Sequence, residues 1–220
     1  MVIATQAEAD TLKIIPGIKN TQAGLSLGSS EIIPLVTGVG SVATAWAMTK
    51  WISSGSKPDL ALNIGIAGSY RDDLVTGEVA VPVSDCFADA GVDTGKSFLT
   101  LAEAGLEDPD RFPFRGGWIN AENRFVTKAS EVLRTVRAVT VNTASGSPFN
   151  IKMILKKYHP DIETMEGAAF FYICSKENIP FLALRAVSNR VEPCNKERWN
   201  IPLALNNLSE RLKEVLFLFE

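Results

Sequence analysis

The chain has 220 residues and a mass of 23.8 kDa, which is enough for one domain with a sizeable core. Hydrophobic residues make up 46% of it and charged residues 21%, a balance that excludes intrinsic disorder. The net charge of -3 and the pI near 5.4 leave no basic surplus, so nucleic acid is not expected as the main partner.

Two further classes are excluded by pattern. The longest apolar run, residues 168–174, is far shorter than the about 20 residues of a membrane-spanning helix, and the N-terminus has no basic segment of a secretory signal. Cys86, Cys174 and Cys194 are scattered, and His159 is the only histidine, so neither a disulfide framework nor a zinc or multi-histidine metal site is predicted. We therefore expect a cytoplasmic protein whose cysteines are small buried hydrophobes.

The first half of the chain alternates strand-like and helix-like runs. Four runs have the apolar pattern of strands: residues 1–5, 31–37, 60–66 and 78–84. Residues 41–53 have the small and apolar composition of a helix, which Gly55 and Pro58 end. Pro82 lies inside the fourth run and predicts an edge strand or a β-bulge there.

The second half continues the alternation after a long segment, residues 89–117, that is rich in Gly, Asp and Pro and is expected to be a functional or partner-facing loop. The elements expected after it are, in chain order, a helix over 123–134, a strand over 138–143, a short helix over 147–157, a helix that residues 161–164 enter and that runs to about 176, a strand over 181–187, and an amphipathic helix over 202–219. This order predicts an α/β fold with a largely buried sheet, formed by a single domain over residues 1–220.

Ligands of open α/β sheets bind at the carboxyl ends of the strands, so the residues that follow each strand are the candidates for a site. Two carboxylates and an amide stand there, Glu8, Glu166 and Asn189, together with small residues that expose their backbone. Taken singly, each has an ordinary explanation: the acids favour helix starts, Asn189 favours a turn, and the glycines supply turns. Together they predict a polar pocket for a small molecule.

Four segments in this order resemble the nucleoside phosphorylase and nucleosidase superfamily: residues 37–40 (TGVG), 65–68 (GIAG), 165–169 (MEGAA) and 185–189 (RAVSN). The resemblance covers essentially the whole chain, and the third and fourth segments are its most specific part. It implies a three-layer αβα sandwich with a central mixed β-sheet, and a nucleoside as the small-molecule substrate. It implies neither a metal nor an organic cofactor.

The nucleophile and the base are the two choices within that superfamily. Phosphorylases of this type carry an arginine on the strand that corresponds to residues 60–64, which has none here, and this favours water as the nucleophile; Arg71, just beyond, leaves phosphate open. Adenine-specific nucleosidases have Asp where this chain has Asn189, and an amide suits a 6-oxopurine better. Residues 87–92, 163–169 and 188–192 look like the futalosine hydrolase branch, which releases hypoxanthine from futalosine.

The resemblance also implies the role of each site residue. Glu8 would be the general base for water, Glu166 would bind the ribose hydroxyls, and Asn189 would bind and polarise the departing base. The expected substrate-binding residues are Ile66, Ala67, Gly68, Met165, Ser188 and Trp199.

Some expectations concern the rest of the substrate and the alternatives. Four arginines are candidates for meeting the 5′-side carboxylate of futalosine: Arg71, Arg124, Arg190 and Arg198. The resemblance implies a homodimer or higher homo-oligomer, in which residues 89–117 of a neighbour would close the 5′ end. The alternatives are a methylthioadenosine or S-adenosylhomocysteine nucleosidase, a purine nucleoside phosphorylase, and a non-catalytic purine-binding protein.

Overall fold

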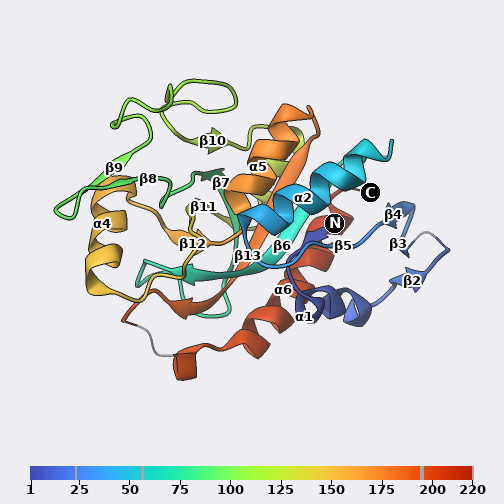
Figure 1. The fold of residues 1–220 in the computed structure, drawn as a ribbon. Coiled ribbons are helices and arrows are strands. Elements are labelled where there is room, and N and C mark those ends of the chain that lie inside the picture. Colours follow the sequence, from blue (N-terminus) through green and yellow to red (C-terminus); the bar gives the residue numbers. More distant parts are fainter. Residues whose placement is uncertain (23, 56, 194–195, 220) are drawn as a thin grey trace.

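A mixed eight-stranded sheet forms the centre of the described structure (Figure 1). The computed structural model describes all residues except 23, 56, 194, 195 and 220, so the prediction for Cys194 lies outside the described residues; Cys86 and Cys174 are buried, as predicted. The strands of this sheet are β1 (Val2–Ile3), β5 (Leu35–Val36), β6 (Ala61–Ser69), β7 (Val79–Asp85), β10 (Ile119–Asn120), β11 (Arg134–Thr140), β12 (Ile162–Thr164) and β13 (Phe181–Arg190).

Part of this sheet closes on itself. Strand β6 pairs with β13, β13 with β7, β7 with β11, β11 with β12, and β12 again with β6. One buried cluster has members on all these strands: Ala67, Leu74, Ala80, Val136, Ala138, Ile162 and Val187. Alanine and valine predominate in it because the interior of a small closed sheet has room for short side chains only.

Helices cover both faces of the sheet, which confirms the predicted sandwich (Figure 1). Helices α2 (Ser41–Ser53) and α5 (Gly167–Lys176) pack together on one face. The other face carries α6 (Ile201–Phe217), the short α1 (Gln6–Asp10) and the 3-10 turn η1 (Thr11–Ile14). Helices α3 (Arg124–Ala129) and α4 (Pro148–Tyr158) complete the set, and none of the described helices has the length and apolar character needed to cross a membrane.

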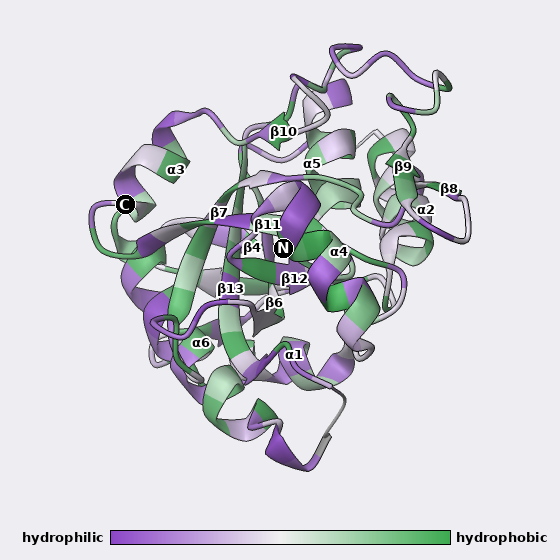
Figure 2. Cartoon of the chain, turned by 90° about the vertical axis from the view of Figure 1, so that its left-hand side faces the viewer, coloured by the Kyte–Doolittle hydropathy of each residue, from purple (hydrophilic) through white to green (hydrophobic). Residues whose placement is uncertain are grey.

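The C-terminal helix shows how the sequence pattern becomes packing. Ala204, Leu208, Leu212 and Val215 are fully buried against the sheet, at spacings of three and four residues. Figure 2 shows hydrophobic and hydrophilic colours alternating along α6, as expected for a helix with one buried face.

Short strands lie outside the central sheet. Strands β2 (Lys19–Asn20), β3 (Leu25–Leu27) and β4 (Ser30–Ile32) form a small antiparallel sheet. Strands β8 (Gly91–Asp93) and β9 (Phe98–Thr100) form a hairpin within the segment that was expected to be a loop. The 3-10 turn η2 (Lys196–Arg198) precedes α6.

The helices expected over 123–134 and from 161–164 to about 176 differ from the structure, and the choice left open at Pro82 is decided. The helix expected over 123–134 ends at Ala129, and β11 already begins at Arg134. Residues 162–164 are a strand that fills the gap between β11 and β6, and do not enter the following helix. Of the two alternatives predicted at Pro82, the structure has the bulge: β7 has neighbours on both sides, and its register with β11 shifts beside Pro82.

Candidate active site

Three predicted residues, Glu8, Glu166 and Asn189, lie buried at the carboxyl ends of the strands, at 6%, 9% and 9% exposure. Glu8 belongs to α1, which follows β1; Glu166 stands at the N-terminus of α5; Asn189 lies near the end of β13. Segments far apart in the sequence therefore bring their polar groups to one end of the sheet, as predicted.

The Glu8 carboxylate is held by hydrogen bonds on both oxygens. Its Oε2 accepts from the backbone N–H of Thr5 at 2.9 Å and from the Thr5 hydroxyl at 2.8 Å, in a capping box at the start of α1. Its Oε1 accepts from the backbone N–H of Ile66 at 3.2 Å, which ties α1 to β6. A Cβ at Gly65 would lie 2.8 Å from Oε1, so this glycine leaves the space that the carboxylate occupies.

Glu166 is oriented by the loop that precedes α2. Its Oε1 accepts from the backbone N–H of Gly40 at 2.8 Å, and the Ser41 hydroxyl donates to the backbone carbonyl of Met165 at 3.2 Å. Burial raises the pKa of Glu166, while the nearby Arg185 and the Gly40 hydrogen bond counteract this rise.

A buried arginine with no predicted role lies between the acids. Arg185 is 2% exposed; its Nη1 donates to the backbone carbonyls of Asn63 and Leu184, both at 3.0 Å, and its Nη2 donates to the Asn63 side chain. A Cβ at Gly65 would lie 3.9 Å from Arg185 Cζ and 2.8 Å from Glu8 Oε1, so both charged groups border the same glycine. The signal in the sequence was a charged residue within the apolar strand 181–187.

The charges around Arg185 are unequal. Burial lowers the pKa of its guanidinium, and three carboxylates, Glu166, Glu8 and Asp85, oppose that effect. Asp85 is itself fully buried: burial raises its pKa to about 7, although the Thr140 hydroxyl donates to its Oδ1 at 2.9 Å. The pair of Glu8 and Glu166 thus has one cation nearby, and this end of the sheet favours a positively charged ligand.

The Asn189 amide is fixed by its neighbours. The Ser188 hydroxyl lies 2.8 Å from Asn189 Oδ1, and Asn189 Nδ2 donates to the backbone carbonyl of Arg190 at 2.9 Å. A Cβ at Gly68 would lie 3.3 Å from Nδ2, so the amide stands beside this glycine. One amide hydrogen and one carbonyl lone pair remain for a ligand.

The other predicted residues differ in how closely the structure ties them to this site. The backbone carbonyl of Ala67 accepts a hydrogen bond from the Ser188 hydroxyl at 3.2 Å, which links β6 to β13, the strand that carries Asn189. Met165 directly precedes Glu166 and is partly exposed. Trp199 is half-buried, and the next residue, Asn200, donates its backbone N–H to Ser188 at 2.8 Å, so this segment also borders the site.

The four arginines proposed for the 5′-side carboxylate differ in their partners and in their positions. Three have carboxylate partners: Arg71 pairs with Asp73 and Asp161, Arg190 with Asp72, and Arg198 with Glu192. Arg124 follows Asn123, whose side chain donates to the backbone carbonyl of Phe181 at 2.8 Å. Arg124 therefore lies at the start of β13, at the other end of the strand from Asn189.

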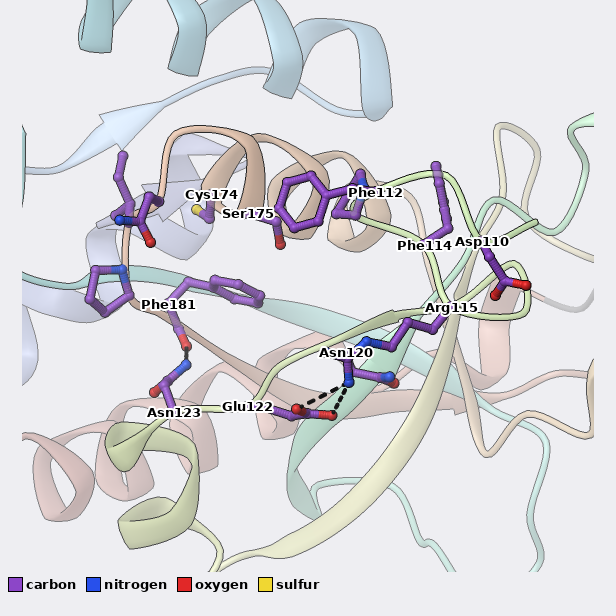
Figure 3. A pocket seen from close by; sticks show the side chains of 14 residues that line it. Asp110, Phe112, Phe114, Arg115, Asn120, Glu122, Asn123, Cys174, Ser175 and Phe181 are labelled. Carbon is purple, nitrogen blue, oxygen red and sulfur yellow. Dashed lines mark hydrogen bonds and ion pairs between the residues drawn. The ribbon is translucent and has the colours of Figure 1, made fainter. Parts of the chain in front are cut away.

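A cavity of about 490 Å³ lies elsewhere in the molecule and is not lined by Glu8 or Glu166 (Figure 3). Phe181, Asn123 and Cys174 line it, at the start of β13 and the last turns of α5. Figure 3 shows the Arg115–Glu122 ion pair on one side of it and Phe112 on another. This cavity is not the candidate active site. Among the described residues, no cluster of His, Cys, Asp or Glu has the arrangement of a metal site.

Comparison with known proteins identifies the class. The model of the Phosphorylase superfamily matches residues 5–217, and the chain belongs to this family. The family predicted from the sequence motifs is thus confirmed.

The similar proteins fall into two groups, futalosine hydrolases and 5′-methylthioadenosine/S-adenosylhomocysteine nucleosidases. The chain is 28% identical over 208 residues to a futalosine hydrolase of Streptomyces coelicolor, covering 89% of this chain and 83% of that protein. It is 26% identical over 189 residues to a 5′-methylthioadenosine/S-adenosylhomocysteine nucleosidase of Shewanella baltica, covering 84% and 75%. The native structure of futalosine hydrolase of Helicobacter pylori shares the fold, with a TM-score of 0.79, 17% identity, and 98% and 95% coverage.

Both groups of relatives are named for hydrolysis or nucleosidase activity. The chain is therefore an enzyme of the nucleosidase branch, a hydrolase of N-glycosidic bonds, and the prediction of an enzyme of this class is confirmed.

Proposed function

We propose that the protein hydrolyses the N-ribosidic bond of futalosine and releases hypoxanthine and dehypoxanthinyl futalosine. The observation that carries the proposal is the amide of Asn189, held beside Gly68 by Ser188. Its free amide hydrogen suits O6 of a 6-oxopurine, and its carbonyl suits a proton on N7. The similarity to futalosine hydrolases supports the same substrate.

The geometry supports the following roles for the two carboxylates. Glu8 takes a proton from water as the water oxygen bonds to C1′, and the bond from C1′ to N9 breaks with its electron pair moving to the purine. Positive charge develops on the ribose, and Glu166, whose carboxylate lies near Glu8 and Arg185, accepts the ribose hydroxyls and stabilises this charge. Asn189 stabilises the leaving base, which takes a proton at N7 from solvent.

The proposed binding residues position the substrate by contact with its base and its ribose. Ile66, Ala67 and Gly68 present backbone to the base and ribose, and Met165 packs beneath the ribose. Trp199 forms a wall of the pocket. Neither a metal nor an organic cofactor takes part in these steps.

The second candidate is a methylthioadenosine or S-adenosylhomocysteine nucleosidase, which the similarity to such enzymes favours. A phosphorylase is less well supported, because Arg71, which follows β6, already pairs with Asp73 and Asp161. A non-catalytic purine-binding protein would have no need of two buried carboxylates beside one cation.

The test is chromatography of the purified protein with futalosine, inosine and methylthioadenosine, each with and without phosphate. We expect hypoxanthine from futalosine, independent of phosphate. Adenine from methylthioadenosine in its place would establish the second candidate, phosphate dependence would establish a phosphorylase, and no release from any nucleoside would favour the binding protein.

We also propose that the protein is one domain, works in the cytoplasm and forms a homodimer. Helix α2 supports the dimer, because its apolar residues Val42 and Trp46 are 81% and 64% exposed. The helix lies next to the site, since the backbone N–H of Gly40, directly before it, donates to Glu166. A second copy on this face would approach the site, with its segment 89–117 at the 5′ end. Light scattering after chromatography should give a dimer mass for the wild type and a monomer mass for Trp46→Glu.

A further inference from the structure

A buried carboxylate that the steps above do not use lies on the other side of Gly68 from Asn189. Glu163 is 7% exposed and belongs to β12, where it pairs in register with Gly68 of β6. Asn189 pairs in register with the same glycine from β13. A Cβ at Gly68 would lie 3.3 Å from Asn189 Nδ2 and 3.4 Å from Glu163 Cγ, so the two side chains flank one glycine.

The Glu163 carboxylate is oriented by two donors. Tyr70 donates its hydroxyl hydrogen to Oε2, and the backbone N–H of Ser145 donates to Oε1 at 2.9 Å. Burial, and then the charge of Glu163, raises the pKa of Tyr70 far above its usual range, so the tyrosine keeps its proton. A carboxylate has about four lone-pair positions, so two donors leave acceptor capacity on Glu163.

The free acceptor positions of Glu163 could accept a hydrogen bond from one edge of a purine. In a 6-oxopurine, N1 carries a hydrogen, and N1, O6 and N7 follow one another along one edge. In a 6-aminopurine, N1 is a lone pair, which a carboxylate repels. A buried acceptor beside Gly68 therefore distinguishes the two bases at N1, while an amide on the other side of Gly68 meets O6 and N7.

We propose that Glu163 is a specificity-determining residue that accepts the N1–H of a 6-oxopurine and disfavours adenine. The proposal rests on the proposed function, since it assigns the second half of base recognition in the same pocket. It gives Tyr70 and Ser145 the task of orienting the acceptor.

The first test compares futalosine with its 6-amino analogue, which differs only at the base. In Glu163→Gln, we expect kcat/KM for futalosine to fall by about tenfold or more, the range for loss of one hydrogen bond to a charged group, while kcat/KM for the analogue is unchanged or rises. Glu122→Gln, an exposed glutamate paired with Arg115, is the control and should change neither. A role in holding Tyr70 and Ser145 alone would lower both substrates equally, and that result would overturn the proposal.

The second test does not depend on turnover. Calorimetry should show that Glu163→Gln weakens the binding of hypoxanthine by about tenfold. The affinity for 1-methylhypoxanthine, which lacks an N1–H, should be unchanged, and the affinity for adenine should be unchanged or higher. If the wild type releases no base from futalosine, the proposed function fails, and this comparison still decides the role of Glu163. An equal loss of affinity for all three bases would contradict it.

Discussion

At the scale of single residues, the site consists of charged groups whose surroundings fix their roles. The Glu8 carboxylate accepts three hydrogen bonds, two from Thr5 and one from Ile66, and these fix its position. Glu166 has the Gly40 N–H and the nearby Arg185. The position of Glu8 suits the proposed base, and Glu166 stands where its charge can stabilise a cation.

We expect Glu8→Gln to lower kcat by about 10²–10⁴-fold, the range for removal of a general base, because an amide cannot take the proton of water. Calorimetry should show hypoxanthine binding close to that of the wild type, since the amide keeps the shape of the side chain. Glu31→Gln, on the exposed part of β4, serves as the control. Near-normal turnover would remove Glu8 from this role.

We expect Asn189→Asp to lower kcat/KM for futalosine and to raise the relative activity on methylthioadenosine. A carboxyl group in this position can protonate N7 and accept the 6-amino group of adenine, whereas it loses the donor to O6. The ratio of the two kcat/KM values is the measurement, and an unchanged ratio would show that Asn189 does not read the base.

At the scale of elements, sequence pattern predicted the helices with one buried face and the long buried strands. It did not predict β12 as a strand, because residues 162–164 carry two polar side chains that local pattern cannot distinguish from a helix start. Their extended form is imposed by β11 and β6 on either side. The same limit applies to the site: motifs identified Glu8, Glu166 and Asn189, whereas the roles of Arg185 and Glu163 depend on pairings between distant strands.

The closeness of β6 to the carboxylate of Glu8 gives a prediction about one strand position. Gly65→Ala places a Cβ 2.8 Å from Glu8 Oε1, so we expect this side chain to shift and kcat to fall by more than about tenfold, with a stability loss of about 1–3 kcal/mol. Gly55→Ala is the matched control: it has φ near +92° and no neighbouring atom within 4 Å, so it should destabilise without affecting kcat. Thermal unfolding and steady-state kinetics of both variants separate the two effects. Equal kcat values in both variants would contradict the prediction.

At the scale of the whole molecule, the buried acids make stability depend on pH. Burial raises the pKa of Asp85 from 3.8 to about 7, so folding favours its protonated form. The stabilising contribution is complete below about pH 4, the pKa of the unfolded chain, and is lost as the pH rises through 7.

We therefore expect Asp85→Asn, which is neutral at every pH, to gain stability relative to the wild type between pH 4 and pH 8. The gain should be on the order of 2–4 kcal/mol, because one pKa unit corresponds to about 1.4 kcal/mol. Urea unfolding at pH 4, 6 and 8 measures it, with Asp110→Asn, on an exposed loop, as the control. A difference that does not change with pH would show that Asp85 is ionised throughout.

The closed ring of strands has a consequence for synthesis of the protein on the ribosome. Strands β6 and β7 emerge early, but the strand that lies between them, β13, is made more than 90 residues after β7 ends. Until then, both strands present unpaired backbone on the sides that β13 will cover, which is a hazard for association with other chains. Asn189 and Arg185 arrive with β13, so the growing chain acquires its last pairings in the central sheet and these two residues of the candidate site in the same step.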